Sequence, residues 1–147
     1  MSKVENARTD FEAGFSCSQA LLAAYGAQLG LDRETALKVA GAFGGGIGRL
    51  GRTCGAVTGS FMVIGLKYGK TKAEDDETKE KTYRLVGEFV EEFMARNGST
   101  ICRELLGSDI GTPEGMQLAE ERGLFTSLCP KLVQDAAEIV GQLLERE

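Results

Sequence analysis

Histidine is absent from this chain of 147 residues. Its absence excludes a Cys–His catalytic pair and every zinc site that needs an imidazole ligand. The four cysteines, Cys17, Cys54, Cys102 and Cys129, lie far apart and form no Cys-x-x-Cys pair. That spacing excludes the zinc-ribbon and thioredoxin patterns. A metal held by these cysteines would be bound mostly through sulfur.

Long apolar runs are also missing. The longest, FMVIGL at residues 61–66, is far too short to cross a bilayer. The first residues, MSKVENARTDF, lack the apolar core of a secretory signal. The net charge of −5 repels nucleic acid and anionic membranes. We therefore expect a cytoplasmic protein with no nucleic-acid partner and no membrane insertion, in which thiols stay reduced.

Alternating β-branched or aromatic runs are scarce, whereas apolar residues recur at helical spacing between capping residues. This pattern predicts an all-α fold, a single compact domain of six to seven helices over residues 1–147 with no strand. The expected helices span residues 16–30, 33–43, 53–68, 75–96 and 99–107, a segment from 112 onward, and 129–147.

The cysteines share a position on these expected helices. Cys17 follows Ser16 in a capping box, Cys54 follows the expected cap Thr53, and Cys102 falls in a first turn. Cys129, with Pro130 after it, is the expected cap of the last helix. Helix starts favour thiolate over thiol, so we predict that the four cysteines converge on one redox or metal site. The alternative is that each cysteine is a small buried apolar residue.

Cations and glycines accompany these cysteines. Arg52, Arg103 and Lys131 are sequence neighbours of Cys54, Cys102 and Cys129. Arg52 and Arg103, together with the helix N-termini, are expected to offset part of the charge of four thiolates. Gly55 and Gly59 leave one face of the expected helix at 53–68 bare, which clears space beside Cys54 for another thiol, a cluster or a substrate. We therefore assign Gly55, Gly59 and Arg52 to cofactor binding.

A second interpretation concerns the glycine-rich stretch before Cys54. GIGRLG, residues 46–51, fits the dinucleotide fingerprint GxGxxG, but the preceding segment is helical in pattern and no strand precedes it. We therefore expect no nucleotide. Arg49 and Arg52 still leave open an anion site. The alternative function is a non-catalytic helical binding module with an anion or small-molecule site at the Gly44–Gly55 loop.

Four segments carry a resemblance to a known family: FSCSQA, FGGGIGRLGRTCGAVTG, STICRELLG and SLCPKLV. Their order resembles the redox-active protein family named for its C…CGAxxG…C…C pattern, whose length covers essentially the whole chain. The resemblance implies a redox protein of bacterial or archaeal type without an established reaction. A similar domain occurs in split-Soret cytochromes, which bind haem and for which an iron–sulfur site has been suggested. The present chain lacks histidine and Cys-x-x-Cys-His, so we expect no haem.

Two versions of a joint cysteine site follow. In the first, all four cysteines are ligands of an iron–sulfur cluster or another thiolate-bound metal. In the second, pairs such as Cys17 and Cys54 perform thiol–disulfide chemistry. Either version is compatible with an oxidoreductase or an electron carrier. The sequence leaves the redox partner unknown and homo-oligomerisation open.

Overall fold

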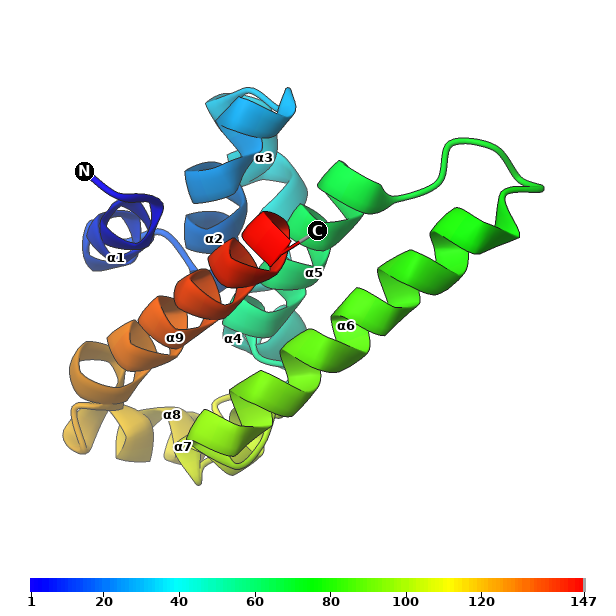
Figure 1. Cartoon of the computed structure of the whole chain (residues 1–147). Helices are drawn as coiled ribbons and strands as arrows, with labels where there is room; N and C mark the ends of the chain where they lie inside the picture. Colours follow the sequence, from blue (N-terminus) through cyan, green and yellow to red (C-terminus); the bar gives the residue numbers. More distant parts are fainter. Residues whose placement is uncertain (147) are drawn as a thin grey trace.

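The computed structural model describes residues 1–146, which form the all-helical fold that the sequence predicts (Figure 1). The helices are α1 (Lys3–Glu12), α2 (Cys17–Gly26), α3 (Arg33–Ala40), α4 (Gly44–Ile47), α5 (Gly55–Tyr68), α6 (Asp76–Asn97), α7 (Cys102–Leu106), α8 (Pro113–Glu121) and α9 (Leu124–Arg146), with a 3-10 turn, η1 (Ala27–Leu29), after α2. Extended pairing within residues 1–146 is limited to one isolated bridge, between Thr53 and Ile101. None of the helices in this range is long and apolar enough to span a bilayer.

Capping residues set most helix ends where the sequence predicts them. The Ser16 side chain accepts the N–H of Gln19, and the Gln19 side chain reaches back to the Ser16 N–H, which completes the capping box of α2. The Asp32 and Asp75 side chains accept the N–H of Thr35 and of Thr78 and so cap α3 and α6. At the other end of α6, Gly98 adopts the left-handed conformation that ends helices. The sequence therefore fixes these ends by local chemistry.

Three predicted helix starts are wrong. Cys54, not Thr53, is the N-cap of α5, because Thr53 is engaged in the bridge to Ile101. For the same reason α7 begins at Cys102 rather than at residue 99 or 100. The last helix begins at Leu124, so Cys129 lies inside α9 rather than at its cap. The helices α1 and α4 add to the six to seven that the sequence predicts, and α3 ends at residue 40 rather than 43.

The early start of α9 has a local cause. Gly123 adopts a positive φ of 64° after α8, and its carbonyl accepts hydrogen bonds from the side chains of Thr126 and Ser127. These contacts start the helix before Pro130, which lies inside α9 and lacks the N–H that would bond the carbonyl of Thr126. A proline normally marks a first helical position, which is why the sequence pattern misplaces this start. The expected end of this helix at residue 147 lies outside the described residues.

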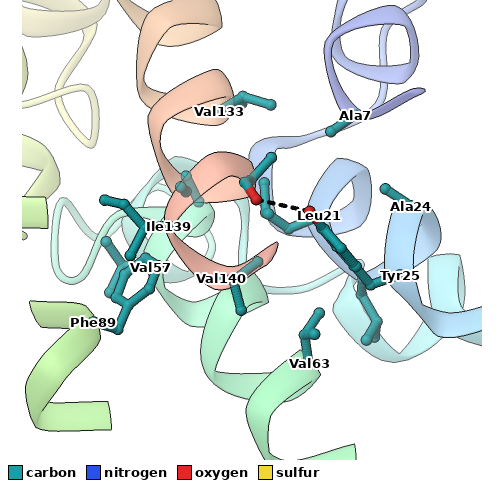
Figure 2. Packing of buried hydrophobic residues seen from close by; sticks show 14 of the residues in the cluster. Ala7, Leu21, Ala24, Tyr25, Val57, Val63, Phe89, Val133, Ile139 and Val140 are labelled. Carbon is teal, nitrogen blue, oxygen red and sulfur yellow. Dashed lines mark hydrogen bonds between the residues drawn. The ribbon is translucent and has the colours of Figure 1, made fainter. Parts of the chain in front are cut away.

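The core holds together the elements that carry the cysteines. Helix α2 packs against α5, and α9 crosses α1, α5 and α6. Phe89 and Phe93 of α6 stack at 5.8 Å between ring centroids and are fully buried. The Tyr25 hydroxyl of α2 donates a hydrogen bond of 2.7 Å to the Ala137 carbonyl of α9 (Figure 2). Packing therefore fixes α2, α5 and α9 relative to one another, each with one cysteine in it or at its cap.

Candidate redox site

Cys54 and Cys102 are brought together by a short antiparallel contact between two loops. The Cys54 N–H donates to the Thr100 carbonyl at 2.8 Å, and the Cys102 N–H donates to the Arg52 carbonyl at 2.6 Å. These bonds flank the Thr53–Ile101 bridge. The two cysteines therefore enter α5 and α7 side by side. The sequence shows no alternating pattern that predicts this pairing, because only one residue on each side is bridged.

Glycines let the neighbouring elements approach these cysteines. A methyl group added at Gly55 would lie 3.2 Å from the Cβ of Cys17, and one at Gly59 would lie 2.8 Å from the carbonyl oxygen of Ser18. A methyl group at Gly46 would lie 2.6 Å from the Cβ of Cys102. Ordinary Cβ contacts are longer, so side chains at these positions would push the elements apart. The bare face of α5 thus receives α2, which carries Cys17.

All four cysteines line one cavity of about 110 Å³, and all four are free thiols. Cys17 is partly exposed, while the other three residues are buried. The remaining lining residues are mostly apolar or glycine: Phe11, Ser16, Gly45, Gly46, Gly55, Leu105, Leu106, Ile110, Phe125 and Leu132. The sequence identified the cysteines and the glycines. It did not identify the apolar wall, because single apolar residues on separate helices carry no local signal.

The four thiols interact electrostatically in every pairwise combination. The strongest of these interactions is between the neighbouring thiols of Cys17 and Cys129. Within residues 1–146, however, no three cysteine or acidic side chains are placed closely enough to form the ligand set of a metal ion. The thiols therefore surround a common space without meeting at one point.

Burial controls the protonation of the two thiols on the loop contact. It raises the pKa of Cys54 from its usual 9.0 to about 12, although the backbone N–H groups of Ala56 and Val57 oppose this shift. It likewise raises the pKa of Cys102 to about 11. These directions are the reverse of the thiolate preference that helix starts predict. In this apolar pocket the cost of removing a charge from water outweighs the helix dipole.

Cys17 and Cys129 behave as a pair. The neighbouring Cys129 thiol, followed by burial, raises the pKa of Cys17 well above its usual value. The Cys17 thiol in turn lowers the pKa of Cys129. The pair therefore loses its first proton from Cys129 more readily than an isolated thiol, and retains the second on Cys17. Cys129 is thus the one of the four thiols whose surroundings favour the thiolate in the metal-free, reduced protein.

The three cations near the cysteines in sequence do not line the cavity. Arg52 is exposed, and Lys131 forms an ion pair of 2.8 Å with Asp135. The Arg103 side chain lies over the backbone of Gly51. Gly55 does line the cavity, and Gly59 lies one turn further along α5, against α2. Neither the Arg52 nor the Arg103 side chain is therefore placed in the cavity lining, where it would offset the charge of the thiolates.

The raised pKa values make the stability of the metal-free, reduced protein depend on pH. Above pH 9 the unfolded chain loses thiol protons that Cys54 and Cys102 keep in the folded state, so alkali favours unfolding. We expect the unfolding free energy to fall by about 1.4 kcal/mol per pH unit for each of these thiols. Urea titrations from pH 8 to pH 10 measure the slope. Because Cys17 also keeps its proton in the folded state, Cys54→Ala should remove about a third of the slope, and a flat profile in the wild type would refute the assignment.

The comparisons with known proteins bear on this site. A family model described as "Putative redox-active protein (C_GCAxxG_C_C)" matches residues 15–143, which include all four cysteines. Within the match, the central element reads Cys54-Gly55-Ala56-Val57-Thr58-Gly59, so that glycine follows cysteine where the family label writes Gly-Cys-Ala. No curated protein and no solved structure gives a significant match to the chain.

Proposed function

The chain belongs to the C_GCAxxG_C_C family of redox-active proteins, and on this premise we propose that Cys17, Cys54, Cys102 and Cys129 are the ligands of an iron–sulfur cluster. The protein would serve as an electron carrier or as the electron-transferring part of an oxidoreductase. The observation that carries the proposal is the shared cavity, which thiols from four separate elements line.

The size of the cavity favours a small inorganic group. One water occupies about 30 Å³ of liquid, whereas pockets for organic ligands measure about 300–1,000 Å³. A volume of about 110 Å³ accommodates several heavy atoms, but it is too small for a flavin, a nucleotide or a haem. Close packing normally eliminates such voids from a protein interior, so an apolar cavity among four thiols calls for an occupant.

The donor set favours a cluster over a single ion. Thiolates select iron–sulfur clusters, zinc and copper(I) among the metals that proteins use. No three of the thiols are placed as ligands of one ion, yet every pair interacts, so the spacing suits a group wider than one atom. Four cysteine ligands are also the usual number for a cluster.

The residues around the thiols support this chemistry. The backbone N–H groups of Ala56 and Val57 favour the thiolate of Cys54, and Phe11 and Leu132 give the cavity apolar walls. A bound cluster supplies one-electron transfer at a potential set by burial and by hydrogen bonds to sulfur. Because the metal-free thiols hold their protons, loading must release protons and is favoured as the pH rises.

Anaerobic reconstitution with ferrous iron and sulfide tests the proposal. We expect the wild type to gain iron, acid-labile sulfide and visible absorbance, and Cys102→Ser to lose most of all three. Gln142→Ser is a suitable control, because Gln142 is exposed on α9, the helix that carries Cys129, and does not line the cavity. A colourless, metal-free wild-type product with four titratable thiols would refute the cluster.

A second candidate function is thiol–disulfide exchange between Cys17 and Cys129. The closeness of these two thiols favours it, because Cys129, whose pKa is lowered, has Cys17 as an immediate partner. In this reaction the Cys129 thiolate attacks a disulfide oxidant and releases one thiol. Cys17 then attacks the Cys129 sulfur of the mixed disulfide, releases the second thiol, and forms the Cys17–Cys129 bond. The two cysteines lose two electrons and two protons, and the oxidant becomes two thiols.

Oxidised glutathione and mass spectrometry distinguish the two candidates. Thiol exchange predicts a Cys17–Cys129 disulfide in a protein that stays metal-free after reconstitution. The cluster predicts that iron loading protects all four cysteines from the same oxidant. A metal-free protein whose four cysteines all stay reduced would count against both candidates.

A further inference from the structure

We propose that a surface groove beside the cysteine cavity binds a small organic anion that exchanges electrons with the site. Residues of α4, the loop after it and α8 form the groove, and its volume is about 600 Å³. That volume lies within the range of pockets for organic ligands. Binding of the anion is independent of the proposed cluster, and only the electron exchange depends on it.

The groove and the cysteine cavity share a wall. Ser16, Gly45, Ile110 and Phe125 line both, so one layer of residues separates an occupant of the groove from the thiols. A smaller groove at Pro130 also reaches this wall, but its only charged lining residue is a glutamate. Two further surface grooves share no lining residue with the cavity. Among these grooves, the first therefore both shares a wall with the cysteine cavity and has a cationic side chain in its lining.

That cation is Arg49. It is exposed, and its side chain makes no hydrogen bond or ion pair with the part of the chain that the structure describes. Its Cγ would lie 3.0 Å from a methyl group added at Gly45, so its stem rests on the shared wall. The backbone of Arg49 adopts a positive φ of 67°, which a residue with a side chain rarely does. The protein thus holds a free guanidinium at the groove, despite its net charge of −5.

The other lining residues define the class of ligand. Glycines, among them Gly44 and Gly48, form much of the groove and allow a flat molecule to lie against the backbone. Ile110, Met116 and Phe125 supply apolar contacts. Arg49 suits a carboxylate, sulfonate or phosphate group, to which a guanidinium forms charge-assisted hydrogen bonds.

The lining points to a planar organic redox molecule with one anionic end. Glu120, also in the groove, accepts from an N–H or O–H of the ring and disfavours a second anionic group there. The exchange moves one electron between this molecule and the cysteine site, and no covalent bond forms or breaks.

FMN and riboflavin are the probes, because they share one ring system and differ in the phosphate. We expect metal-free wild-type protein to bind FMN about tenfold or more tightly than riboflavin, as flavin fluorescence measures at low ionic strength. Arg49→Gln should remove this preference, and Arg49→Lys should restore part of it. Lys72→Gln makes the same charge change in the α5–α6 loop, away from the groove, and should leave the preference intact.

Equal affinities of the wild type for the two flavins, an unchanged preference in Arg49→Gln, or no FMN binding would each overturn the proposal. Stopped-flow oxidation of the reduced, iron-loaded protein by FMN adds a kinetic measurement. Its rate should saturate with FMN concentration in the wild type and lose saturation in Arg49→Gln. Iron loading and flavin binding are separate measurements, so the failure of one is distinguishable from the failure of the other.

Discussion

Replacing Gly46 with alanine is expected to lower the free energy of unfolding by about 2–5 kcal/mol and to abolish most iron loading. Gly46 has a φ of +70°, and an alanine there costs about 1–2 kcal/mol in backbone strain. Its methyl group would also lie 2.6 Å from the Cβ of Cys102 and 2.7 Å from the backbone nitrogen of Arg52. Overpacking of this kind costs about 1–3 kcal/mol more.

The effect on the site follows from the hydrogen bonds of the same loop. The Arg52 N–H donates to the Gly46 carbonyl, and the Arg52 carbonyl accepts the Cys102 N–H. A displaced Gly46 therefore moves Cys102 away from the other thiols. Urea unfolding and iron analysis after reconstitution measure the two effects.

Gly107→Ala provides the matched control. Gly107 has a similar φ of +66°, but nothing lies within 4 Å of the added methyl group. We expect this variant to show the backbone cost alone, about 1–2 kcal/mol, with normal iron loading. If the two variants were equally stable and loaded iron equally well, the close approach of Gly46 to Cys102 would have no energetic role.

Alanine substitutions at two glycines of α5 are expected to have opposite signs. Gly65→Ala should raise the free energy of unfolding by about 0.5–1 kcal/mol, because alanine favours the helix and nothing lies within 4 Å of the new methyl group. Gly59→Ala gains the same helix propensity but places its methyl group 2.8 Å from the Ser18 carbonyl oxygen and 2.9 Å from the Cβ of Leu21. Overpacking costs about 1–3 kcal/mol, so after the helix-propensity gain we expect a net loss of up to about 2.5 kcal/mol.

The difference in stability between Gly59→Ala and Gly65→Ala measures the cost of disturbing the packing of α2 on α5, because both variants gain the same helix propensity. A Gly59→Ala variant as stable as Gly65→Ala would mean that α2 moves aside without cost. In that case Cys17 would not be held rigidly beside Cys54. Chemical denaturation of both variants under identical conditions, with the difference between their midpoints as the readout, decides the question.

Local chemistry made most of the fold predictable. Ser16, Asp32 and Asp75 cap helices by hydrogen bonds to residues three positions later, so a short window of sequence contains the whole signal. Pro130 misled the prediction, because proline favours a first helical position and the contacts of Gly123 started the helix earlier. The missed starts of α5 and α7 depend on a bridge between residues 53 and 101, which no local window includes.

The features of the candidate site also separate into those that the sequence predicts and those that depend on the folded structure. The cysteines and the bare face at Gly55 and Gly59 were visible in the sequence, because unusual residue types at regular spacing need no partner to be noticed. The direction of the thiol pKa values was not visible, since it depends on burial by residues from several helices, such as Phe11 and Leu132. The interaction between the thiols of Cys17 and Cys129 was not visible either, because the two residues are distant in the chain.

The distribution of the four thiols along the chain has a consequence for biosynthesis. Cys17 begins α2 and Cys129 lies in α9, so the cavity closes only after the segment that contains Cys129 has left the ribosome. A group bound to all four thiols would tie α2 to α9 and remove loop-closure entropy from the unfolded chain. Insertion of the group would thus follow the synthesis of α9, and a product truncated before Cys129 would lack one of the four thiols.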